Sequence, residues 1–122
     1  MARIAWGKAA LNNIMEIEGQ KAVVTFDPEI GMFRGEFIGL SGGADFYATS
    51  VDGLREEGRL SLRTYLEMCA EDGIEPFRQF SGRFNVRIDA ELHQAAVTAA
   101  KAQHKSLNEW VVDAIDRAAR EG

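Results

Sequence analysis

The most constraining feature of the chain is a six-residue segment, residues 83–88, in which polar and apolar side chains alternate. Its apolar members are Phe84, Val86 and Ile88, and its polar members are Arg83, Asn85 and Arg87. Successive side chains of a β-strand point to opposite faces of the strand. The alternation therefore predicts a strand with one apolar face and one hydrogen-bonding face.

This strand has no pairing partner close by in the sequence, because two helical patterns follow it directly. A lone strand leaves its main-chain N–H and C=O groups without hydrogen bonds. We therefore expect a second copy of the chain to pair with it as an antiparallel ribbon across a dimer axis. A ribbon of this kind fits the major groove of DNA, where arginine and asparagine pair with guanine and adenine. Arg83, Asn85 and Arg87 are the expected base contacts.

Two helices are predicted after the strand, joined by a turn at residues 103–105. The first begins at the N-cap Asp89 and repeats apolar residues at helical spacing, namely Leu92, Ala95 or Ala96, Ala99 and Ala102. The second begins with the capping-box sequence Ser106-Leu107-Asn108-Glu109. Its apolar stripe comprises Leu107, Trp110, Val111, Ala114, Ile115 and Ala118.

The apolar faces of the strand and the helices are expected to form a core that two copies share. The predicted members of this dimer core are Phe84, Val86, Ile88, Leu92, Leu107, Trp110, Val111 and Ile115. The amide groups at the start of the second helix could hold a DNA phosphate. The predicted phosphate contacts are Lys105, Ser106, Leu107 and Asn108.

A strand, a helix, a turn and a helix with this face pattern resemble the ribbon-helix-helix DNA-binding domain. More narrowly, SGRFNVRIDAELH, with KSLNEWVVDAIDRA after it, resembles the C-terminal domain of HicB-type antitoxins. This resemblance covers residues 81–119 and implies a dimeric repressor. The family often has glycine in the turn between the helices, where this chain has His104. A left-handed backbone costs a residue other than glycine roughly 1–2 kcal/mol.

Residues 1–80 form a second predicted domain, of α+β class and with the order β-β-β-α, with residues 1–13 as an irregular extension. A first strand begins near residues 14–19 and continues through the alternation at 21–26; the others lie at 32–40 and 45–48. Ser50 is expected to cap a helix that ends at Gly73. Its expected apolar stripe comprises Val51, Leu54, Gly58, Leu62, Tyr65 and Cys69. Residues 74–80 are either a short last strand or the linker to residues 81–122.

That element order also resembles the N-terminal domain of HicB-type antitoxins. The likeness rests on VTFDPE before a glycine turn, on an aromatic third strand and on a helix that ends in YLEMCAEDG. It implies that residues 1–80 bind and block a HicA-like ribonuclease toxin, a small protein of double-stranded-RNA-binding fold.

The charge distribution separates the two predicted domains. The chain has a net charge of −5, and residues 81–122 contain six basic and six acidic side chains, so the whole acidic surplus lies in residues 1–80. An acidic domain indicates either a basic protein partner or a role in solubility. One cysteine, no apolar run of about 20 residues and no signal-peptide pattern favour a cytoplasmic protein without a membrane partner.

No catalytic constellation is evident, and we expect neither enzyme activity nor a cofactor. His93 and His104 lie on a predicted helix and its turn, and Cys69 lies on an apolar stripe. A metal cluster of ribonuclease-H type could be imagined from Asp27, Glu29, Asp45 and Asp52. Their spacing matches no metal-ligand motif, and turn and capping roles explain them.

The sequence therefore predicts an antitoxin that neutralises a HicA-like mRNA-cleaving ribonuclease and represses its own operon as a homodimer or higher oligomer. One alternative is a stand-alone repressor without a toxin, in which residues 1–80 serve oligomerisation or ligand sensing. A less favoured alternative is a small metal-dependent ribonuclease. An adjacent gene for a basic, histidine-containing protein would separate the first two.

Overall fold

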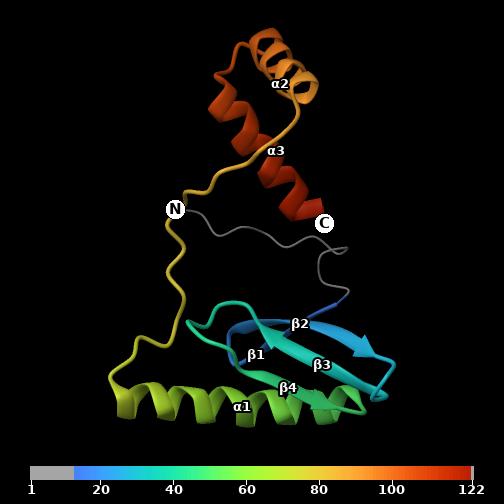
Figure 1. Ribbon diagram of the computed structural model, residues 1–122, viewed down its shortest axis with the longest axis vertical. Helices are drawn as coiled ribbons and strands as arrows, with labels where there is room; N and C mark the ends of the chain where they lie inside the picture. Colours follow the sequence, from blue (N-terminus) through green and yellow to red (C-terminus); the bar gives the residue numbers. More distant parts are fainter. Residues whose placement is uncertain (1–12, 122) are drawn as a thin grey trace. The chain divides into compact units, whose positions relative to one another are not determined.

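The computed structural model describes residues 13–121 and has four strands and three helices there (Figure 1). The fold is α+β, as predicted. Contacts divide these residues into two compact units, residues 13–81 and residues 82–121. The extension predicted for residues 1–13 lies, except for its last residue, outside the described residues.

The first unit contains an antiparallel sheet with the strand order β1-β2-β3-β4. The strands are Ile14–Ile17, Gln20–Asp27, Met32–Phe37 and Asp45–Ala48. The prediction of three strands was wrong, because a hairpin divides the first one. Glu18 and Gly19 have positive φ angles of 48° and 84°, as a two-residue type I′ turn requires.

Helix α1 (Val51–Asp72) runs along one face of this sheet (Figure 1). The hydroxyl of Ser50 accepts the N–H of Gly53 at 3.0 Å, and Gly73 ends the helix with a φ of 67°. Both predicted caps are therefore confirmed. The predicted stripe is buried from Leu54 to Cys69, but Val51 is 57% exposed and was assigned wrongly.

The core of the first unit lies between α1 and the sheet. Its buried apolar side chains are Met15, Ile17, Ala22, Phe37, Leu40, Phe46, Ala48, Leu54, Leu62, Tyr65 and Cys69. A Cβ atom at Gly58 would lie 2.2 Å from Ile17 Cδ1, and one at Gly35 would lie 2.2 Å from the Phe46 ring. Helix propensity alone disfavours Gly58 by about 1 kcal/mol. A side chain at position 58 would have to displace the buried Ile17, so close packing between α1 and the sheet favours glycine there.

Residues 74–80 lie beside the chain that follows β3. Leu40 and Phe77 form an isolated bridge, and the N–H of Arg78 donates to the carbonyl of Gly39 at 2.8 Å. The N–H of Ser41 donates to the carbonyl of Pro76 at 2.9 Å. Two alternatives were open for this segment. The structure favours the linker, attached to the first unit at one bridge, and not a fifth strand.

The second unit contains α2 (Ala90–Ala102) and α3 (Leu107–Glu121). Asp89 caps α2, because its carboxylate accepts the N–H of Leu92 at 2.7 Å. Residues 83–88, which were expected to be a strand, belong to no strand of the single chain. The physical reason is that no described segment lies beside them to complete a ladder.

Candidate functional site

The segment of residues 83–88 is exposed along its whole length. Phe84 is 70% exposed, Val86 64% and Ile88 43%. No main-chain hydrogen bond joins residues 84–88 to another segment among the residues described. In the described part of the chain, an apolar face and a row of main-chain donors and acceptors are therefore both left without a partner.

The predicted base contacts occupy the alternate positions of the same segment. Arg83, Asn85 and Arg87 are all exposed and lie within the six residues before Asp89, the N-cap of α2. Their spacing at every second residue would place them on one face if the segment were to pair as a strand. Base contact itself stays a prediction.

The turn between α2 and α3 is built around His104, whose φ is 56°. The N–H of His104 donates to the carbonyl of Lys101 at 3.1 Å, and the N–H of Lys105 donates to the carbonyl of Ala100 at 2.9 Å. These two hydrogen bonds form a Schellman motif, in which the left-handed position is usually glycine. The left-handed backbone considered for His104 is therefore confirmed.

The start of α3 confirms Ser106 as the predicted N-cap, and Glu109 reaches back to the hydroxyl of Ser106. The hydroxyl of Ser106 accepts the N–H of Glu109 at 3.1 Å and lies 3.2 Å from its carboxylate. The amide groups of Leu107 and Asn108 have no acceptor among the described residues. These two N–H groups point from a helix N-terminus and are suited to an anion.

Lys105 has a partner that the sequence did not indicate. Its ammonium group forms an ion pair with Asp113 in α3, eight residues away. The hydrogen bond from Lys105, and then its charge, hold the pKa of Asp113 below the ordinary value of a carboxyl group. A phosphate at this turn would therefore share Lys105 with Asp113.

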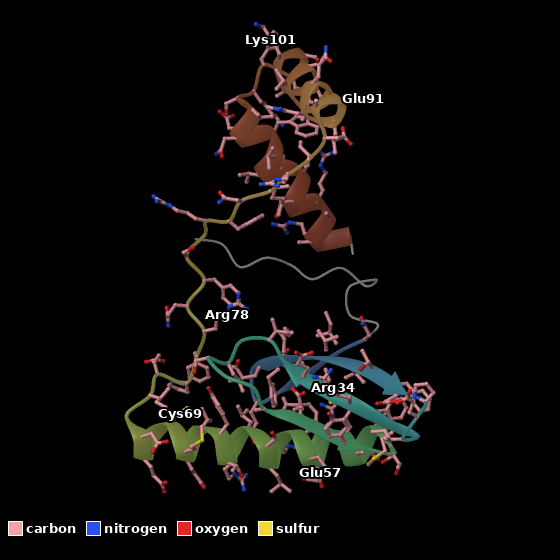
Figure 2. All side chains as sticks on the ribbon, viewed as in Figure 1. Arg34, Glu57, Cys69, Arg78, Glu91 and Lys101 are labelled. Atoms are coloured by element: carbon pink, nitrogen blue, oxygen red, sulfur yellow. The ribbon has the colours of Figure 1, made fainter. Side chains whose placement is uncertain are left out.

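The two predicted DNA-contacting groups lie at opposite ends of α2, whose first turn holds Glu91 and whose last turn holds Lys101 (Figure 2). With 13 residues, α2 is about 20 Å long. One chain does not bring residues 83–87 and residues 105–108 together. A single DNA-facing surface would therefore need the geometry of a dimer.

The helix pair buries little of its apolar surface by itself. Ala96 and Ala100 are the buried side chains in the described part of this unit. Of the predicted dimer core, Leu107, Trp110 and Val111 are half-buried, whereas Leu92 and Ile115 are 52% and 43% exposed. Two further exposed apolar residues, Val97 and Val112, were missed, because they fall outside the apolar stripes predicted from the sequence.

Two of the four acidic residues considered for a metal site make contacts that support the fold. A carboxylate oxygen of Asp27 accepts the N–H of Glu29 at 3.0 Å in the β2–β3 turn, and Asp45 pairs with Arg34. Within residues 13–121, no three His, Cys, Asp or Glu side chains are arranged to hold a metal ion. Cys69 is buried, as predicted. None of the described helices is both long and apolar enough to cross a membrane.

Comparison with known proteins gives a family match over the region that contains this site. Residues 65–115 match the HicB family. The match begins in the second half of α1 and ends in α3, so it includes residues 83–88 and the α2–α3 turn. It confirms the HicB resemblance over this segment, which is less than half of the chain. No curated protein and no solved structure gave a significant match.

Proposed function

We propose that the chain is a HicB-type antitoxin that neutralises a HicA-like mRNA-cleaving ribonuclease and represses its own operon as a dimer. The observation that carries the proposal is the HicB match over residues 65–115. The matched segment contains the end of the acidic unit, the exposed segment 83–88, α2 and the first part of α3. It therefore includes parts of both units to which the proposal gives a function.

The DNA-binding half of the proposal rests on residues 84–88, whose main-chain groups have no hydrogen-bond partner in another described segment. Pairing of two copies of this segment would satisfy the open main-chain groups of residues 84–88 and cover Phe84, Val86 and Ile88. The same pairing would present two sets of Arg83, Asn85 and Arg87 on the opposite face, toward a major groove. The amide groups of Leu107 and Asn108 would then hold phosphates on either side.

The toxin-binding half rests on charge. Residues 13–81 contain 13 acidic and six basic side chains, whereas residues 82–122 contain six of each. An enzyme that binds and cleaves RNA needs a basic surface for the phosphate backbone. The acidic unit is therefore the complementary surface for such an enzyme, and the balanced unit is left to bind DNA.

Growth rescue tests the proposal directly. The basic ribonuclease-like product of a gene adjacent to this one is expressed alone, with the full chain, with residues 1–80 or with residues 81–122. We expect the full chain and residues 1–80 to restore growth, and residues 81–122 to fail. Rescue by residues 81–122 alone would reverse the assignment of roles. Binding of the full chain to its own promoter, without rescue, would indicate a stand-alone repressor instead.

A further inference from the structure

A groove of about 590 Å³ lies between β4 and α1 in the first unit. The strand side is formed by residues 43–47, and the helix side includes Glu57, Leu60, Thr64 and Met68. Three large apolar side chains in the groove are exposed: Leu60 at 53%, Met68 at 44% and Tyr47 at 42%. The groove therefore offers apolar surface that the described residues leave uncovered.

The strand that borders the groove has an open edge. β4 is the last strand of the sheet, and no main-chain hydrogen bond reaches Asp45–Ala48 from any described segment other than β3. The opposite edge of the sheet differs, because Arg55 donates to the main-chain carbonyl of Glu16 in β1 at 3.2 Å. An open edge beside an apolar groove is the arrangement to which an extended segment adds as a further strand.

The dimensions of the groove suit a short strand. Leu60 and Met68 are eight residues apart on α1, which corresponds to about 12 Å along the helix axis. Four residues of strand span about 13 Å. The side chains of β4 alternate, with Phe46 and Ala48 buried toward α1 and Asp45 and Tyr47 exposed on the other face. An added strand would therefore need apolar side chains toward α1 and polar ones beside Asp45 and Tyr47.

The charges around the groove favour a cationic strand. Glu57, which Figure 2 shows on α1, lines the groove and has no ion-pair partner among the described residues, while Arg34 forms ion pairs with both Asp45 and Glu36. The exposed ring of Tyr47 is a further site for a lysine or arginine. A second copy fits less well, since edge-to-edge pairing would bring together two units that each carry seven more acidic than basic side chains in residues 13–81.

We propose that the β4 edge and the facing side of α1 bind an extended segment in which apolar and cationic residues alternate. This inference rests on the proposed function, because the basic toxin would supply the extended segment. The added strand would bond to the open main chain of β4, bury its apolar side chains against Leu60 and Met68, and place its cations on the face of Asp45 and Tyr47, while Glu57 on α1 would add negative charge at the groove. Main-chain bonds would supply affinity, and the alternation would supply specificity.

A peptide titration tests the site without the toxin. Two nine-residue peptides, one of alternating lysine and valine and one of alternating glutamate and valine, are added to the full-length ¹⁵N-labelled chain. We expect the lysine peptide alone to shift the amide signals of residues 43–48 and 57–68 in a saturable manner. Equal shifts with both peptides, no shifts, or shifts centred elsewhere would overturn the proposal. Shifts of the same amides on simple dilution of the protein would assign the groove to a second copy.

A pair of charge reversals locates the interaction. Glu57→Arg should weaken binding of the lysine peptide by about three- to fivefold, because it replaces an attractive charge at the groove by a repulsive one. Glu29→Arg changes the net charge equally but lies in the β2–β3 turn, outside the groove, and should change binding less than twofold. Equal effects would mean that only net charge matters. Growth rescue by a chain that fails both peptide tests would refute this site and leave the proposed function standing.

Discussion

The two units of this chain differ in how much of their apolar surface one copy can bury. Residues 13–81 enclose 11 buried apolar side chains between a sheet and a helix. In the described part of residues 82–121, Ala96 and Ala100 alone are buried, while Phe84, Val86, Leu92 and Val112 are each more than half exposed. The first unit has a core of its own. The second unit has exposed apolar side chains, in residues 83–88 and on its helices, from which a core shared by two copies could form.

This difference has a thermodynamic consequence. A segment of about 40 residues buries too little surface to be stable alone, unless association supplies the rest. The stability of the second unit should therefore depend on protein concentration, whereas the stability of the first should not. Each of the following variants tests one side of that contrast.

Val86→Asp should have the largest effect. In the proposed ribbon Val86 lies in the shared core, and a buried unpaired carboxylate costs several kcal/mol. We expect the variant to sediment as a monomer at micromolar concentrations and to lose amide-exchange protection in α2 and α3, while residues 13–81 keep theirs. Asn85→Asp is the matched control, because it adds the same charge on the opposite face and should leave the dimer intact. A folded wild-type monomer at those concentrations would refute the ribbon.

Local signals predicted much of what the structure shows. Ser50, Gly73, Asp89 and Ser106 were predicted as caps from the residues beside them, and each makes the expected hydrogen bond or adopts the expected backbone. The stripe from Leu54 to Cys69 was readable for the same reason, since helical spacing depends only on near neighbours. Caps and stripes are encoded within about four residues, so one sequence suffices to find them.

Features that join distant residues could not be predicted in this way. The pairing of Lys105 with Asp113 depends on the angle at which α3 leaves the turn, and the groove along β4 depends on where α1 crosses the sheet. The hairpin at Glu18 and Gly19 was missed for a different reason, because strand-like residues flank this turn closely and conceal it. Base contact by Arg83, Asn85 and Arg87 remains a prediction, since it requires DNA and a second copy.

Substitutions on the polar face of residues 83–88 should have a smaller effect, which should be limited to DNA binding and should leave the fold unchanged. Loss of a bidentate base contact typically costs about 1–3 kcal/mol and relaxes sequence preference at that position. Arg87→Ala and Asn85→Ala should each lower affinity for the promoter duplex by roughly tenfold, with the fold unchanged. Binding to promoter and scrambled duplexes is compared at one fixed salt concentration, because the electrostatic contribution varies steeply with salt.

The control for this binding measurement is a substitution in the first unit, residues 13–81. Arg63→Ala removes the same charge from the exposed surface of α1 and should leave promoter preference unchanged. If Arg63→Ala weakens binding as much as Arg87→Ala does, general charge and not the segment determines affinity. Full promoter preference in both Arg87→Ala and Asn85→Ala would mean that the segment does not read bases.

The smallest expected effect is a gain in stability at the turn of the second unit. His104 holds a φ of 56° in the Schellman motif, a conformation that glycine adopts without steric strain. His104→Gly should therefore raise the free energy of unfolding of residues 82–121 by about 1 kcal/mol, part of the relieved strain being offset by the greater freedom of glycine when unfolded. His93→Gly is the matched control, since the same substitution inside α2 should lower it by roughly 0.5–1 kcal/mol. Amide exchange of α2 and α3 at one fixed protein concentration measures both changes, and the first unit should be unaffected by either. A loss of stability in His104→Gly would show that the imidazole makes a contribution larger than the strain of its backbone.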